Sequence, residues 1–255
     1  MVNGDGSSTS DGSATDGATI DGGDAATGPV DGSMPVFGCD IPQNDPSLLA
    51  YYAFDEGMGT TAKDCTGHGH DGVITAPTWT TGQHGGALSF NGTSSCVDLG
   101  AAAALRLTTF TLTAWSNATT YVSTGINGHI LGKSNGNPNA IGWRFATVAS
   151  PNIFELKLAV DGGSPFSLAS PAGQPTGVWV HVAVVLVPNQ RADLYVGGAR
   201  VANNATPPGI FEDTTASMRI GCNGGGPKDF FTGSLDEVRI YTRALADSEI
   251  AALAH

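Results

Sequence analysis

Hydrophobic and polar residues alternate along several short segments of this chain, as they do in strands with one buried face. The segment FTLTAW (110–115) places Phe110, Leu112 and Ala114 on one side. Three further β-rich segments follow at residues 129–133, 141–148 and 154–160. Clusters of Asn, Gly, Pro and Ser separate these segments, which is typical of turns between strands.

The second half of the chain continues this pattern of strands and turns. The segment VWVHVAVVLV (178–187) is apolar on both faces, which predicts a strand covered on both sides. RADLYVGGARV (191–201) predicts a hairpin, because Gly197 and Gly198 can supply the positive φ of a tight turn. Only DSEIAALAH (247–255) has a helical pattern. Many short strands with almost no helix predict an all-β sandwich or jelly roll.

The first 36 residues differ in composition from the rest. Asp-Gly recurs among Ser, Thr, Ala and Gly, with six Asp and no Lys or Arg. Such a segment buries too little apolar area to offset its ordering entropy. A calcium-binding repeat would need a fixed period, and the spacing here drifts. We therefore expect a disordered acidic tether over residues 1–36 and a single domain over residues 37–255.

Charge and hydropathy exclude some classes of partner. The net charge is −12 and the 11 basic residues are scattered, which argues against nucleic acid as a partner. No apolar run reaches the roughly 18 residues of a membrane-spanning helix. The N-terminus lacks the basic start and apolar core of a signal peptide. We expect an exported protein whose leader has been removed.

Four cysteines, Cys39, Cys65, Cys96 and Cys222, favour disulfides in an oxidising compartment. None belongs to a C-x-x-C pair, so a zinc knuckle is disfavoured. Three connectivities are possible, and four reduced, buried cysteines are the alternative.

A family resemblance rests on six segments, taken in order. They are YYAFDEGMGTTAKDCTGHGHDG (51–72), GGALSFNGTSSCVDLG (85–100), FTLTAW (110–115), GVWVHVAVVLV (177–187), DLYVGGARV (193–201) and RIGCNGGG (219–226) followed by FFTGSLDEVRIYTRALADSEIAAL (230–253). Together they resemble laminin-G-like domains of the concanavalin A-like lectin/glucanase superfamily. The resemblance implies two stacked antiparallel sheets, with the first strand (48–54) near the strand at 234–242. It also favours a Cys65–Cys96 disulfide, which leaves Cys39–Cys222.

Function follows from the same resemblance. Such domains are mostly non-catalytic modules of secreted or surface proteins that bind glycans or proteins, or serve as spacers. Leaders of this composition are similar to those of bacterial surface lipoproteins. We therefore expect a secreted or cell-surface recognition module, on the bacterial outer surface or in the periplasm, whose partner is a glycan or an extracellular protein. A lipid anchor upstream of the chain fits this expectation.

Many members of the family carry a structural calcium ion, which takes six to eight oxygen ligands. The resemblance brings three loops together and proposes Asp64, Asn91 and Asp236 as ligands, with carbonyls completing the shell. The alternative is that Asp64 and Asn91 stabilise turns and that Asp236 is an ordinary acid at a strand edge.

One alternative function is a structural or adhesive spacer domain, and another is a glycoside hydrolase or polysaccharide lyase on the same fold. A hydrolase needs two carboxylates that face each other across a cleft. None of the five Glu has an acidic partner two residues away in a strand. Asp236 and Glu237 are adjacent, so regular alternation would place them on opposite faces. The sequence therefore favours binding over catalysis.

The candidate ligand residues are Trp143, Arg144, Asn135 and Asn137. They combine an aromatic ring with amides within one segment, and sugar sites often join these groups. Trp143 lies in a predicted strand beside the Gly- and Asn-rich segment KSNGNPNAIG. We therefore expect it to face a concave surface.

Overall fold

The structure is a computed structural model that describes Cys39 and residues 45–121, 127–134, 142–149, 151–159, 165–206, 215–223 and 229–255. The chain divides into two units, Met1–Pro35 and Val36–His255, and all the described residues belong to the second. The predicted tether over residues 1–36 and the ligand candidates Asn135 and Asn137 lie outside the described residues.

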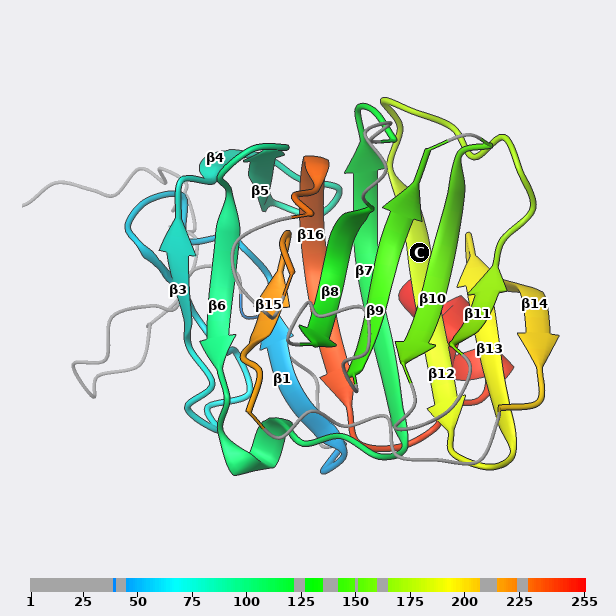
Figure 1. Cartoon of the computed structure of the whole chain (residues 1–255). Helices are drawn as coiled ribbons and strands as arrows, with labels where there is room; N and C mark the ends of the chain where they lie inside the picture. Colours follow the sequence, from blue (N-terminus) through cyan, green and yellow to red (C-terminus); the bar gives the residue numbers. More distant parts are fainter. Residues whose placement is uncertain are drawn as a thin grey trace, which may run out of the picture. The chain divides into compact units, whose positions relative to one another are not determined.

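Two antiparallel sheets form a β-sandwich within the second unit, which confirms the predicted fold class (Figure 1). Sheet A has the order β14-β13-β12-β7-β16-β5-β4, and β1 also pairs with β16. Its strands are β1 (Leu48–Tyr52), β4 (Thr78–Thr81), β5 (Gly86–Asn91), β7 (Phe110–Ala118), β12 (Val180–Val187), β13 (Arg191–Val196), β14 (Ala199–Asn204) and β16 (Thr232–Tyr241).

Sheet B has the order β11-β10-β9-β8-β15-β6-β3-β2. Its strands are β2 (Thr61–Ala62), β3 (Gly72–Thr75), β6 (Cys96–Gly100), β8 (Gly128–Ser134), β9 (Gly142–Val148), β10 (Ile153–Ala159), β11 (Phe166–Ala169) and β15 (Met218–Ile220). A 3-10 helix, η1, covers Ala103–Leu105, and a single α-helix, α1, covers Asp247–Leu253. No helix in the described part of the chain is long and apolar enough to cross a membrane.

The main core lies between the two sheets and is built from their inward-facing side chains. Phe110 of sheet A meets Trp143 of sheet B with ring centroids 4.9 Å apart. Leu112 and Leu156 are also buried in this cluster. The alternation at 110–115 therefore predicted the inward face of β7 correctly.

A second, smaller apolar cluster lies on the outer face of sheet A, beneath α1. Ile250 of the helix belongs to it together with Ala183 and Val185 of β12. The opposite side chains of β12, such as Val184, belong to the main core. This explains why β12 is apolar on both faces, as its sequence predicted.

The hairpin β13–β14 also forms as predicted. Gly197 and Gly198 connect its strands with φ of 59° and 79°. These left-handed values are accessible to glycine at little cost, which is why the turn contains two of them.

A bulge divides β16 into two halves with different neighbours. Leu235 pairs with Leu88 of β5, whereas Arg239 pairs with Tyr51 of β1. The register toward β7 shifts between Asp236 and Arg239, and Glu237 has a φ of 54°. Strands β5 and β1 therefore lie end to end along one side of β16, as the predicted proximity of the first strand requires.

Two disulfides join Cys39 to Cys65 and Cys96 to Cys222, with Cα–Cα distances of 5.3 and 5.4 Å. The predicted pairing of Cys65 with Cys96 and of Cys39 with Cys222 is therefore wrong. Cys96 begins β6 and Cys222 follows β15, and these strands are direct neighbours in sheet B. Cys65 lies beside β1 instead, where its backbone N–H donates to Tyr51 O at 2.8 Å.

Candidate functional site

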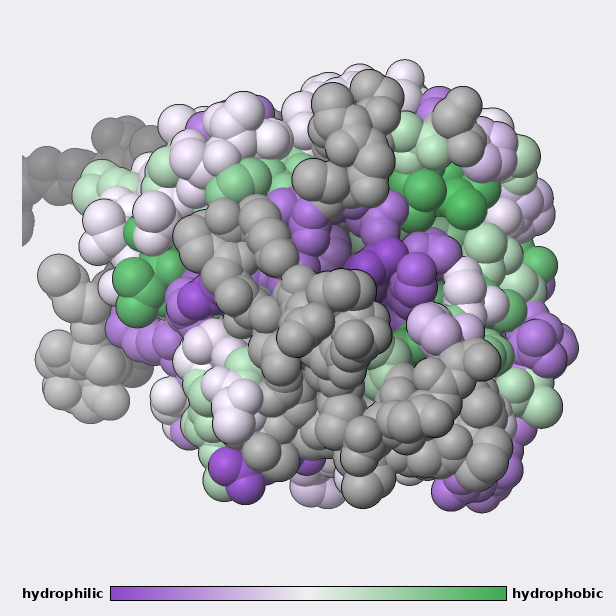
Figure 2. Space-filling view, viewed as in Figure 1, coloured by the Kyte–Doolittle hydropathy of each residue, from purple (hydrophilic) through white to green (hydrophobic). Residues whose placement is uncertain are grey.

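Charged side chains form a line across the outer face of sheet B, which we call the polar row. Strand pairing aligns Asp98, Arg219, Gly132, Arg144 and Lys157 on β6, β15, β8, β9 and β10. On β6, β15, β9 and β10 the neighbours on both sides belong to the main core, and so does the residue before Gly132 on β8, so these five positions face outward. Figure 2 views the domain from this side and shows hydrophilic residues gathered in the middle of the face.

One half of the polar row is anchored by Arg219. Its Nε and Nη2 donate to Asp98 Oδ2 at 2.9 and 2.8 Å, and Nη1 donates to Asn223 O at 3.2 Å. The Arg219 side chain is 16% exposed. A guanidinium held by several acceptors keeps one orientation, so its remaining donors face a fixed direction.

Arg144 anchors the other half. Its Nη2 lies 3.6 Å from Glu155 Oε2, and the Asn127 side-chain carbonyl, in the orientation that satisfies both groups, accepts from Nε at 3.0 Å. Ser167 Oγ donates to the other oxygen of Glu155 at 2.5 Å. The Arg144 side chain is 25% exposed, so part of the guanidinium stays accessible to a ligand.

Between the two arginines the row passes through Gly132. A Cβ at this position would lie 3.1 Å from Nδ1 of His129. The glycine thus makes room for the buried imidazole, whose Nε2 lies 3.9 Å from Asp229 Oδ2. Gly132 itself therefore adds no side chain to the row between Arg219 and Arg144.

Acids and bases are interspersed along this face. The bases Arg219, Arg144 and Lys157 stand beside the acids Asp98 and Glu155. Paired donors and acceptors in fixed positions suit hydroxyl groups, which donate and accept at the same time. The face can therefore bind a hydroxyl-rich ligand without a large change in charge.

The predicted ligand residues had mixed outcomes. Arg144 lies in the polar row, but the prediction for Trp143 is wrong, because its side chain is 1% exposed and belongs to the main core. The two residues are adjacent in β9 and so point to opposite sides. Sequence reasoning missed Asp98, Arg219 and Lys157. Each is a charged residue between two apolar residues of a strand, in VDL (97–99), MRI (218–220) and LKL (156–158). This alternation could have identified them from the sequence.

The predicted calcium ligands do not form one site. Asn91 pairs with Thr232, four residues before Asp236 on β16, which separates the two by roughly 13 Å. Asp64 Oδ1 accepts from Tyr51 N–H at 3.2 Å, near the other half of β16. One ion cannot contact all three at about 2.3–2.6 Å. Within the described residues, no group of three or more His, Cys, Asp or Glu is placed to hold a metal ion.

Asp64 and Asn91 stabilise turns instead. Asp64 accepts from the backbone N–H of Thr66 at 3.1 Å and of His70 at 3.1 Å. Asn91 Oδ1 accepts from the backbone N–H groups of Thr93 and Ser94, both at 2.9 Å. These are side-chain turns, which was the alternative interpretation of both residues.

Asp236 differs from these two because it is fully buried. Its Oδ2 accepts from the His84 backbone N–H at 2.9 Å, and its Oδ1 has no hydrogen-bond partner among the described residues. Burial and the nearby carboxylates of Glu237 and Asp55 raise the pKa of Asp236 to about 7. A buried carboxyl group with a free oxygen is costly, so it points to a chemical role.

The bulge also overturns the argument that Asp236 and Glu237 face opposite sides. Asp236 pairs with Trp115 on the outer face of sheet A. Glu237 Oε1 accepts from the Tyr51 hydroxyl at 2.6 Å, and Tyr51 belongs to the apolar cluster on the same face. A bulge adds one residue to the strand, so two consecutive side chains emerge on one side. Strict alternation missed this carboxylate pair.

Several solved structures share this architecture. The binding domain of Paraclostridial Mosquitocidal Protein 1 superposes with a TM-score of 0.67 at 16% identity, over 82% of this chain and 52% of that one. Domain 4 of AbnA, an extracellular GH43 arabinanase from Geobacillus stearothermophilus, gives a TM-score of 0.62 at 24% identity, over 82% of this chain and 98% of that one.

A third similar structure is the CBM40 of a Ruminococcus gnavus IT-sialidase, with a TM-score of 0.55 at 17% identity over 66% of this chain and 96% of that one. At these identities the likeness concerns the fold. No curated protein sequence matches the chain significantly. A family model described as the concanavalin A-like lectin/glucanases superfamily matches residues 91–251. The chain therefore belongs to the laminin G-like family of the concanavalin A-like lectin/glucanases superfamily.

Proposed function

We propose that this domain is a non-catalytic carbohydrate-binding module and that the polar row on sheet B is its glycan site. The observation that carries the proposal is the pair of fixed guanidinium groups, Arg219 and Arg144, on either side of Gly132. Each arginine has a carboxylate neighbour, so donors and acceptors alternate across the face. Adjacent hydroxyls of a sugar ring match this alternation.

The similar structures support this class of ligand. Domain 4 of the arabinanase was solved in complex with arabinotriose, and the CBM40 was solved bound to α2,3-sialyllactose. These ligands belong to those proteins, and one is neutral whereas the other is acidic. For this chain we propose a glycan that presents vicinal hydroxyls to the polar row.

The setting that we propose is extracellular or on the cell surface. Both disulfides belong to the chemistry of an oxidising compartment. The buried pair Cys96–Cys222 connects two strands of the sheet that carries the polar row. Export and glycan recognition are therefore compatible with the same fold.

A glycan array tests this function. We expect the wild-type domain to bind a defined set of glycans, and the double variant Arg144→Ala/Arg219→Ala to lose that binding. Arg200→Ala is the matched control, because Arg200 forms ion pairs with Asp193 and Asp247 on sheet A and α1. Equal binding by the double variant would contradict the assigned site. Capture of an extracellular protein with no glycan bound would favour a protein-binding module, and turnover of a glycan would favour the hydrolase or lyase.

We also propose that a structural calcium ion binds beside Asp236, in place of the three-residue site predicted from the sequence. Asp55 is its acidic neighbour, and the connection between β4 and β5 approaches both carboxylates closely. A Cβ at Gly82 would lie 2.5 Å from Asp236 Oδ2, and one at Gly85 would lie 2.2 Å from Asp55 Oδ1. The ion would offset the repulsion between the two acids, with backbone carbonyls supplying further ligands.

Thermal unfolding of metal-stripped protein, with CaCl₂ or with EDTA, tests the calcium proposal. A ligand at a hundred times its Kd stabilises by about 2.7 kcal/mol, which raises the Tm of a domain of this size by about 5 °C or more. Asp236→Asn should abolish the rise, whereas Asp64→Asn should retain it. An equal Tm in CaCl₂ and in EDTA would contradict the proposal.

A further inference from the structure

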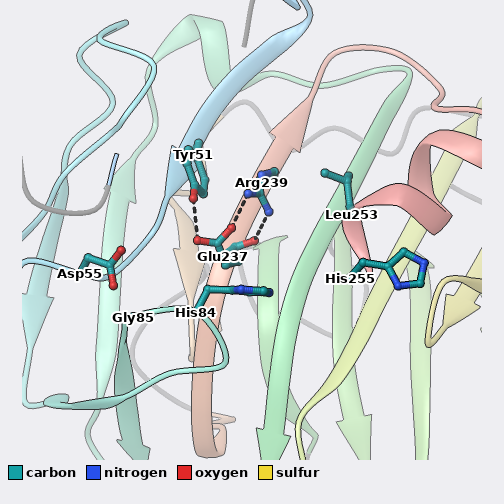
Figure 3. A pocket seen from close by; sticks show the side chains of 8 residues that line it. All are labelled: Tyr51, Asp55, His84, Gly85, Glu237, Arg239, Leu253 and His255. Carbon is teal, nitrogen blue, oxygen red and sulfur yellow. Dashed lines mark hydrogen bonds and ion pairs between the residues drawn. The ribbon is translucent and has the colours of Figure 1, made fainter. Parts of the chain in front are cut away.

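A second candidate site lies on the opposite sheet, at the bulge of β16. It is a pocket of about 420 Å³ that we call the bulge pocket. Figure 3 shows its walls: Tyr51, Asp55, Glu237 and Arg239 on the side of β1 and β16, His84 below, and Leu253 and His255 at the end of α1. Its volume lies within the range of small-ligand sites, about 300–1,000 Å³.

The polar groups of one wall are held in fixed positions. Glu237 accepts from the Tyr51 hydroxyl at 2.6 Å and forms an ion pair with Arg239, as the dashed lines in Figure 3 mark. The guanidinium of Arg239 lies over the Tyr51 ring, 4.2 Å from its centroid. This three-residue unit leaves little rotamer freedom to lose when a ligand binds.

The floor is fixed by contacts between aromatic rings. His84 meets Trp115 at a centroid distance of 5.7 Å, and Trp115 meets His181 at 5.6 Å, both in edge-on geometry. Asp55 accepts from the Gly86 backbone N–H, so the acid on the far wall is fixed as well. Main-chain and ring contacts therefore set the shape of the pocket before any ligand arrives.

Several buried polar atoms on β16, β7 and β12 lack a hydrogen-bond partner among the described residues. Arg239 Nε and the hydroxyl of Thr113, its partner across the ladder to β7, have no hydrogen-bond partner among the described residues. The same holds for both ring nitrogens of His181. Burial, with the nearby Arg239 charge, lowers the pKa of His181 to about 4, so the neutral ring has one donor and one acceptor. Of these residues, only Arg239 lines the pocket.

The chemistry of the walls selects among small ligands. The carboxylates of Asp55 and Glu237 disfavour an anion, and the guanidinium of Arg239 disfavours a cation. Carboxylate acceptors, a guanidinium donor and two imidazoles together match a neutral ligand with several hydroxyls. Leu253 adds an apolar wall, against which the C–H face of a sugar ring can pack.

We propose that the bulge pocket is a second carbohydrate site, which takes one neutral sugar unit through Glu237, Arg239, His84 and His255. The polar row and the bulge pocket lie on the outer faces of opposite sheets. One flat glycan surface cannot reach both sites at once. The domain would therefore bridge two glycan chains instead of binding one chain more tightly.

An NMR titration of backbone amides tests the second site. The probes are D-glucose, D-galactose, L-arabinose and N-acetyl-D-glucosamine, each added in EDTA buffer so that calcium cannot mediate binding. We expect at least one sugar to cause saturable shifts at the amides of Gly85 and Glu237. His255→Ala should weaken that binding about fivefold, as expected for the loss of one hydrogen bond.

A steric variant separates the pocket from the fold. Leu253→Trp should fill the bulge pocket and abolish the shifts, whereas Ala252→Trp, one residue earlier on the exposed side of α1, should retain them. Absent shifts, or shifts that survive Leu253→Trp, would overturn the proposal. The same spectra report the two sites separately. Shifts only at Gly132 and Arg144 would refute the second site and keep the proposed function. Shifts only at Gly85 and Glu237 would keep the second site and refute the polar row as the glycan site.

Discussion

The outer faces of the two sheets differ in how their polar side chains are arranged. Sheet B has register shifts in β15 and β8, yet its pairing still places Asp98, Arg219, Arg144 and Lys157 in one line. Sheet A is covered by α1 on part of its outer face, and the bulge in β16 interrupts its ladder. There two consecutive acids, Asp236 and Glu237, emerge on one side. Alternation predicts side-chain direction where the ladder is regular and fails where a residue is inserted.

The two disulfides give the largest expected effects and probe each region separately. The Cys96–Cys222 link spans 126 residues and joins strands of sheet B, whereas Cys39–Cys65 spans 26 residues and ends beside β1. Loop entropy predicts losses of about 5 and about 3.5 kcal/mol when each pair is replaced by Ala. Urea unfolding of the two double variants measures both values. A larger loss for Cys39→Ala/Cys65→Ala would contradict this ranking.

Two neighbouring residues of β9 test which side chains of sheet B face the core and which face outward. Trp143→Ala should lower the free energy of unfolding by about 3–5 kcal/mol, because it opens a cavity beside Phe110. Arg144→Ala should lower it by about 1 kcal/mol or less, because its ion pair is partly exposed. Urea unfolding at neutral pH gives both numbers. Similar losses for the two variants would mean that the alternation in β9 is misassigned.

An isosteric change compares an acid of the bulge with an acid of sheet B. Glu237→Gln should cost about 2–3 kcal/mol, because it leaves the Arg239 guanidinium, only 12% exposed, without its charged partner. Glu155→Gln should cost under about 1 kcal/mol, since the longer ion pair with Arg144 is more exposed. Thermal and urea unfolding measure the difference. Equal costs would show that the bulge acid is no more strongly coupled than the surface acid.

The smallest effect concerns the ion pairs that tie α1 to the start of β1. Hydrogen bonds from Arg243 lower the pKa values of Asp45 and Glu249 to about 2, below the 3.8 and 4.5 of free groups. A carboxyl group whose pKa is lower in the folded than in the unfolded state stabilises the fold above its unfolded pKa. This stabilisation is lost as pH falls from about 4.5 toward 2. Urea unfolding across this range should show the loss, and Arg243→Ala should flatten it. An unchanged slope in the variant would contradict this assignment.

Much of the fold was predictable from local patterns. Alternation located β7, β9 and β10, and the Gly197-Gly198 pair located the β13–β14 turn. The disulfide pairing was not predictable, because it depends on β15, a strand of three residues, lying between β6 and β8. Cys222 follows that strand, and nothing in its local sequence reveals the neighbour.

The site was predictable only in part, for a related reason. Arg144 was chosen from its segment, yet the polar row also contains Asp98 and Arg219, which are 121 residues apart in the sequence. Trp143 was misjudged because an aromatic beside a polar loop is equally compatible with either face of the strand. The bulge could not be predicted from DEV (236–238), because Glu237 adopts a positive φ, which is uncommon for glutamate.

The central claim is that the polar row on sheet B binds a glycan. Isothermal titration calorimetry with the strongest ligand from the array tests it most directly, through the ratio of Kd values between Arg144→Ala and the wild type. Loss of a charged hydrogen bond in a fixed site should raise Kd by about tenfold or more, while Arg200→Ala leaves it unchanged. Equal Kd values for Arg144→Ala and the wild type would contradict the account.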